Sequence, residues 1–182
     1  HCISSAASDV YKRQDRSRIF KVAAGDGTEK AIVNKNELRI GKDANINVIF
    51  GGSAWNGSNV SENLVTIGAN LTADMVTGGQ AGWESEANNN TVMLGRNATV
   101  RDKLVGGVAV TRANGNKVLL NRDFKIANLS GGGATEEANN NIVTLLGRGE
   151  VSGKLYGGVS NNKSTGNTLN LGNINEPIEM NS

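Results

Sequence analysis

A phrase of about 26 residues recurs five to six times along this chain, and it constrains the fold more than any other feature. Each copy begins with an Asn, continues through two alternating apolar residues to a Gly, and closes on a Gly-Gly pair. A fixed period of this length is typical of stacked repeats, in which each repeat packs only against its neighbours. The sequence therefore predicts an elongated solenoid rather than a compact globule.

Two columns of identical residues define the repeat. The opening residues are Asn36, Asn63, Asn90, Asn116, Asn141 and Asn167. The closing pairs are Gly51-Gly52, Gly78-Gly79, Gly106-Gly107, Gly131-Gly132 and Gly157-Gly158. Asn side chains stacked in successive coils can donate to one neighbour and accept from the other, which predicts an internal hydrogen-bonded ladder. The Gly pairs are predicted to allow a sharp corner at the end of a strand.

The alternation of apolar and polar residues after each Asn predicts short strands. The positions two and four residues after the Asn hold only Val, Ile or Leu, as in Val65 and Ile67. Period two is the pattern of a strand with one buried face. A second apolar cluster precedes each Gly-Gly pair and predicts a second strand, and a polar segment then returns the chain to the next Asn. The predicted fold class is all-β: a parallel β-helix, or β-solenoid, of five to six coils.

A glycine after the first strand is predicted to turn the chain. Gly41, Gly68, Gly95 and Gly172 hold this position, and glycine takes positive φ more readily than other residues. In one repeat Leu146 precedes the glycine, and we interpret it as an insertion. Each coil is therefore expected to run strand, turn, strand, corner and variable return segment.

The two ends of the chain depart from the repeat. Residues 1–14 resemble a translated sequencing-adapter or vector sequence and are excluded from fold reasoning. Residues 15–35 are expected to form a partial coil or lead-in, 36–175 the solenoid, and 176–182 a truncated tail. We expect the array to be cut at both ends, and open backbone edges there predict end-to-end self-association.

Composition excludes several classes of function. The only His and the only Cys are His1 and Cys2, so the remaining chain has no His-based triad, disulfide or zinc cluster. Without Asp9, Lys12 and Arg13 the formal net charge falls from +2 to +1, which argues against a nucleic-acid binder. No apolar run approaches the ~20 residues of a transmembrane segment. We predict no enzyme activity, and no catalytic, cofactor-binding or metal-binding residue.

One column of the repeat is basic and is the first candidate contact surface. It lies six residues after the Asn when Leu146 is counted as an insertion, and it contains Lys42, Arg96, Arg122 and Arg148. Stacked at about 4.8 Å per coil, these residues would form a stripe that attracts sulfated or sialylated glycans or lipopolysaccharide. The alternative is a solvated edge that discourages sideways aggregation.

Two tryptophans in neighbouring return segments are the second candidate. Trp55 and Trp83 each lie four residues after a Gly of the pair column, within polar sequence. An exposed indole ring can stack on a sugar ring, and variable loops on one side of a solenoid commonly carry specificity. The alternative is that each ring folds back over the coil beneath it.

The repeats resemble a known class of bacterial proteins. The phrases at residues 90–107 (NTVMLGRNATVRDKLVGG) and 141–158 (NIVTLLGRGEVSGKLYGG) are similar to the repeats of autotransporter passenger domains and related large adhesins. The resemblance covers about residues 15–175. It implies a secreted β-solenoid exported through the outer membrane and displayed on the cell surface as an adhesive surface or rigid stalk. The implied partners are glycans or proteins of host-cell or bacterial surfaces, with no shared catalytic residues.

Two other classes of function stay open. The coils could belong to a carbohydrate-active β-helix enzyme, although such enzymes need clustered carboxylates and the sequence shows no stacked acidic cluster. They could also be a purely structural component of a surface or matrix. Binding of glycans or cells would distinguish an adhesin from a spacer.

Overall fold

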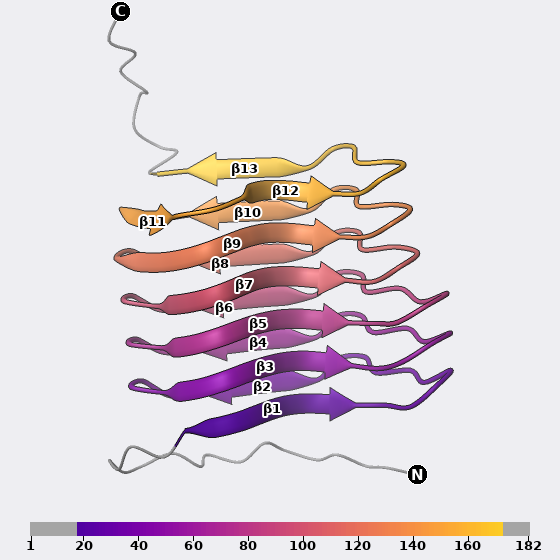
Figure 1. The fold of residues 1–182 in the computed structure, drawn as a ribbon, viewed down its shortest axis with the longest axis horizontal. Helices are drawn as coiled ribbons and strands as arrows, with labels where there is room; N and C mark the ends of the chain where they lie inside the picture. The colour runs from indigo at the N-terminus through magenta and orange to yellow at the C-terminus, as the bar shows by residue number, and fades with distance from the viewer. Residues whose placement is uncertain (1–17, 173–182) are drawn as a thin grey trace, which may run out of the picture.

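The computed structural model describes residues 18–172 as a stack of flattened coils (Figure 1). Every strand pairing in this range is parallel, and the range contains no helix that could span a membrane. The predicted parallel β-solenoid is confirmed. The adapter-like residues 1–14, the tail 176–182 and Asn173, which follows Asn167 by six residues in the sequence, lie outside the described residues.

Each coil has three sides, two of which are sheets. The long-strand sheet contains β1 (Ile19–Asp26), β3 (Asn45–Ser53), β5 (Thr72–Gln80), β7 (Thr99–Val108), β9 (Phe124–Gly133), β11 (Gly149–Val151) and β12 (Leu155–Val159). The short-strand sheet contains β2 (Glu37–Ile40), β4 (Leu64–Ile67), β6 (Thr91–Leu94), β8 (Lys117–Leu120), β10 (Ile142–Leu145) and β13 (Thr168–Leu171). The third side is a line of single parallel bridges through Ile32, Asn59, Glu86, Arg112, Glu137 and Lys163. The return segment is therefore held in register, although its sequence varies.

The core is a narrow column of aliphatic side chains between the two sheets. Val65 and Ile67 on a short strand and Val76 on a long strand belong to one buried cluster, and all three are 0–2% exposed. Each buried side chain of this size contributes about 1.5–3 kcal/mol to the stability of the fold. Every coil therefore depends on the two neighbouring coils that cover its apolar side chains. A second, smaller cluster of Val and Ala residues lies under the return segments. Small aliphatic residues fill most of this space, and the main cluster also includes the ring of Phe124, which is 3% exposed.

The Gly-Gly pairs do not form corners, contrary to the prediction. Each pair lies inside a long strand, and none of these glycines has positive φ. A Cβ built on Gly78 would lie 2.3 Å from the carbonyl oxygen of Gly106 in the next coil. A Cβ built on Gly79 would lie 2.4 Å from Nδ2 of Asn90. The pair is needed because two neighbouring groups, a carbonyl and the Asn side chain, approach the backbone too closely for any side chain.

Two of the glycines after the short strands, Gly68 and Gly95, also act through close approach. Among the four predicted turn glycines only Gly172 has positive φ, and a Cβ on Gly68 would lie 2.8 Å from the backbone nitrogen of Lys42. The left-handed residues of this turn come two positions later, where short polar side chains tolerate φ of 58–63°. They are Asp43, Asn70, Asn97 and Asp123.

Leu146 is not an insertion. Its N–H donates to Leu120 O at 2.9 Å, which is the bond that the turn residue makes in the other coils, so Leu146 occupies the turn position itself. The additional residue of this coil lies between Val151 and Leu155, where the long strand divides into β11 and β12. The register of the basic column changes as a result.

We predict that Gly132→Ala destabilises the fold and that Gly41→Ala does not. A Cβ on Gly132 would lie 2.5 Å from Asn141 Oδ1 and 2.6 Å from Ala113 O, whereas a Cβ on Gly41 meets nothing within 4 Å. Overpacking of this kind costs about 1–3 kcal/mol. Urea unfolding followed by circular dichroism should show the loss for Gly132→Ala only. Equal stability of the two variants would contradict the close-approach explanation.

Candidate functional site

The six Asn residues of the repeat form one continuous ladder along the inside of the solenoid. In each step the backbone N–H and the Nδ2 group of one Asn both donate to Oδ1 of the next, at 2.9–3.1 Å. Nδ2 of Asn90 also donates to Val60 O at 2.9 Å, and equivalent bonds recur at Asn63, Asn116 and Asn167. The four ladder residues from Asn63 to Asn141 are 0–1% exposed. Their amides are fully used inside the protein, so they stabilise the stack and are not a ligand site.

A second ladder runs beside the first, and the sequence reasoning missed it. Each backbone N–H in this column donates to the side-chain oxygen of the coil before, at 2.7–3.3 Å, which is opposite in direction to the Asn ladder. Its members are Asn34, Ser61, Asn88, Asn114, Asn139 and Thr165. The residue between the two ladders always has positive φ, at 56–66°. The signal in the sequence is an Asn, Ser or Thr two positions before the repeat Asn, often with Asn or Gly between them.

The basic column is only partly continuous in the structure. Strand register places Lys42, Ala69, Arg96 and Arg122 at one position of successive coils. Arg148 lies over Asp123 rather than over Arg122, because Gly149 pairs with Phe124. The predicted stacking of Arg148 on Arg122 was therefore wrong, and the cause is that Leu146 occupies a turn position instead of adding one.

Arg148 neutralises part of this surface instead of extending it. Its Nε donates to Asp123 Oδ1 at 2.8 Å, and Nε of Arg122 lies 3.9 Å from Asp123 Oδ2. The hydrogen bond from Arg148, aided by the charges of Arg148, Arg122 and Arg96, holds the pKa of the Asp123 carboxyl below its usual value. The same contact raises the pKa of Arg148. The surface is a three-arginine cluster around one carboxylate, with Lys42 further along the axis.

The two tryptophans are exposed, with 68% of Trp55 and 69% of Trp83 accessible. They are not in one column, since Gly57 N–H donates to Trp83 O and this sets Trp83 against Asn56. Oδ1 of Asn56 accepts the Trp83 N–H at 3.0 Å, and the Ser85 hydroxyl lies 3.1 Å from Trp55 O and 2.8 Å from Trp83 O. The backbone under both rings is therefore fixed while the rings themselves reach solvent.

The described residues hold no group of three or more His, Cys, Asp or Glu side chains that could bind a metal ion. Comparison of the chain with known protein families, curated proteins and solved structures gave no match.

We predict that Asn90→Ala destabilises the protein by about 2–4 kcal/mol. The change removes the acceptor of the Asn63 N–H and Nδ2 groups, and each buried polar group left unpaired costs about 1–3 kcal/mol. Asn45 is the matched control because it is exposed and no side-chain hydrogen bond within residues 18–172 holds it, so Asn45→Ala should change stability by about 0.5 kcal/mol or less. Denaturant unfolding of both variants measures the difference. A ladder without energetic importance would give the two variants equal midpoints.

We predict that Arg148→Ser raises the pKa of Asp123 toward its ordinary value. In the folded protein this pKa lies below 3.8. The ion pair therefore stabilises the fold at pH values above the unfolded-state pKa of Asp123, and this stabilisation is lost as the pH falls through the folded-state pKa. Carbon-detected NMR titration of the carboxyl group measures the shift. Replacing Lys117, which lies on the other sheet, by Ser is the control. An unchanged Asp123 titration in Arg148→Ser would show that the ion pair does not persist in solution.

Proposed function

We propose that this chain belongs to a cell-surface or secreted bacterial protein, in which it forms a rigid stalk with an adhesive surface, as in autotransporter passenger domains and related adhesins. The observation that supports this proposal is the uninterrupted coil-to-coil bonding of the described range. Each coil is joined to the next along two sheets, one line of bridges and two side-chain ladders.

Stiffness follows from this arrangement because the bonds between coils run parallel to the axis along which the coils stack (Figure 1). Bending the stack would lengthen hydrogen bonds on one side and crowd the glycines on the other, where neighbouring groups leave no space for a Cβ. The buried Asn ladder adds a further penalty, since its amides have no alternative partner in the core. Such a structure suits a spacer that holds a binding surface away from a membrane.

The adhesive surface is proposed to be the side that carries Trp55 and Trp83. Tryptophan is a preferred anchor residue in binding interfaces, because a large ring gives much contact area for little loss of side-chain freedom. Both rings are exposed, and their backbones are held by Asn56 and Ser85, so little ordering is needed on binding. The partners we propose are glycans or glycoproteins of host-cell or bacterial surfaces. The arginine cluster contributes attraction to acidic glycans, reduced by Asp123.

We predict that the double variant Trp55→Ser/Trp83→Ser weakens binding to its surface ligand about tenfold or more, since loss of two aromatic anchors removes on the order of 2 kcal/mol. A glycan array and binding to cultured epithelial and bacterial cells provide the measurement. Phe20→Ser is the matched control, because Phe20 is 76% exposed but lies on β1. Absence of binding to every glycan and cell type would favour a purely structural component, and release of shortened polysaccharide would favour an enzyme.

A further inference from the structure

A shallow cavity lies on the outer face of the long-strand sheet, where two irregular coils flank a regular one. In β7 the register with β5 passes from Ala73–Val100 to Met75–Lys103, so this coil contains one additional residue. The coil of β11 and β12 also contains one additional residue, because its register with β9 passes from the pair Ile126–Val151 to the pair Leu129–Leu155. Such bulges leave backbone groups without their usual ladder partners.

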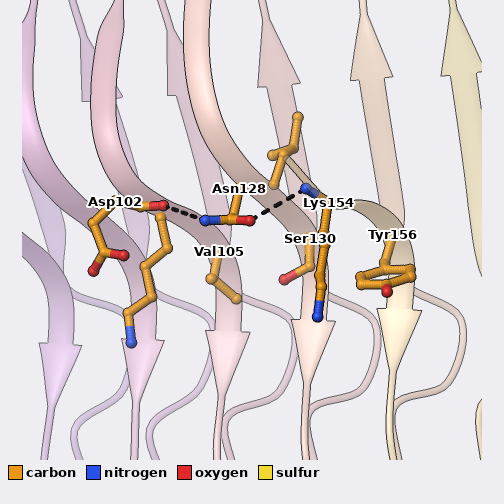
Figure 2. A pocket seen from close by; sticks show the side chains of 8 residues that line it. Asp102, Val105, Asn128, Ser130, Lys154 and Tyr156 are labelled. Carbon is orange, nitrogen blue, oxygen red and sulfur yellow. Dashed lines mark hydrogen bonds between the residues drawn. The ribbon is translucent and has the colours of Figure 1, made fainter. Parts of the chain in front are cut away.

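Asn128 on the regular coil bonds both irregular neighbours. Its Nδ2 donates to Asp102 O at 2.9 Å, and its Oδ1 accepts the Lys154 N–H at 3.2 Å, as Figure 2 shows. One amide side chain thus replaces the ladder bonds that the two bulges remove. The bulges are therefore fixed features of the surface.

The cavity beside Asn128 has a volume of about 250 Å³ and two rows of lining residues. Strand register places Lys103, Asn128 and Lys154 in one row along the axis, and Val105, Ser130 and Tyr156 in the next. Asp102 lies at the rim (Figure 2). In the part of the chain that the structure describes, neither lysine forms an ion pair, and the Ser130 hydroxyl and the Asp102 carboxylate have no hydrogen-bond partner.

We propose that this cavity binds a linear anionic polysaccharide that runs along the solenoid axis. This inference refines the proposed adhesive function, on which it rests, by adding a second contact surface and a ligand class. Carboxylate or sulfate groups of the ligand pair with the ammonium groups of Lys103 and Lys154. One sugar ring packs on Tyr156, which is 40% exposed, and sugar hydroxyls bond Asp102 and Ser130.

Spacing and charge favour this ligand. Lys103 and Lys154 are two coils apart, which is about 9.6 Å at the spacing of neighbouring strands and is close to the length of a disaccharide. A linear glycan with a charged group on every sugar or on every second sugar therefore presents anions at the interval of the two lysines. Asp102 suits a ligand that carries hydroxyl groups between its anions, because a hydroxyl can donate a hydrogen bond to its carboxylate.

The test measures binding of fluorescently labelled polygalacturonate, heparin and neutral dextran to the full chain by fluorescence anisotropy at low and high salt. We expect one or both anionic glycans to bind, with weaker binding at high salt, and dextran not to bind. Lys103→Ser and Lys154→Ser should each weaken binding about tenfold, because each removes a charge-assisted hydrogen bond. Lys→Arg at the same positions should retain binding. Tyr156→Ala should weaken binding at either salt concentration.

The control variant is Lys117→Ser, since Lys117 is exposed on the short-strand sheet and forms no ion pair within residues 18–172. Thermal unfolding establishes that every variant is folded. Binding to polygalacturonate alone would assign carboxylates as the recognised group, and binding to heparin alone would assign sulfates. Equal weakening by Lys117→Ser, or no binding of either anionic glycan, would overturn the proposal. Adhesion through Trp55 and Trp83 would be unaffected by that result, so the two proposals can fail separately.

Discussion

The spacing of about 4.8 Å between coils is the constraint on which the rest of the structure depends. At that distance every side chain lies against the residues at the same position of the coils above and below. The residue type at each position must therefore be able to pack against a copy of itself. The Asn column meets this condition because an amide both donates and accepts, and identical amides therefore bond in series. The second glycine of each pair meets it by leaving space for that amide. Asn and Gly-Gly are thus two parts of one device, because the second glycine of each pair contacts the Asn that follows it 9–11 residues later.

Charged columns cannot use the same solution, because identical charges at this spacing repel each other. One column of the chain alternates in sign, and elsewhere opposite charges form ion pairs between coils. Arg112 lies between Glu86 and Glu137 at 2.6 Å and 3.6 Å. Asp74 pairs with Arg101 of the next coil at 3.1 Å and with Arg18, two coils away, at 2.8 Å. Each exposed pair contributes only about 0–1 kcal/mol. Their main effect is to remove the repulsion that an in-register stack of like charges would impose, as Arg148 does for the cluster around Asp123.

The sequence was sufficient to predict the architecture because the signals that specify it are periodic. The apolar columns, the coil length and the Asn ladder all follow from residues that recur at one position. The roles of glycine were predicted incorrectly, because a local reading offers only positive φ as a reason for Gly, whereas Gly79 and Gly68 are required by groups of another coil. Arg148 was misplaced for a related reason. Its coil has one additional residue, and the alignment gave no indication that the residue is absorbed near Ser152 rather than at Leu146.

Irregularity is also what allows a repetitive scaffold to carry a specific site. A perfectly repeated coil would offer the same surface at every level and could bind a ligand only as a uniform lattice. The single additional residues in β7 and between β11 and β12 break that uniformity, and Asn128 holds both breaks in place. The result is one local arrangement of two lysines, a carboxylate and a tyrosine that the neighbouring coils do not repeat, since their equivalents of Lys103 include Val48 and Met75. Where a solenoid departs from its own period is therefore where its specificity should first be sought.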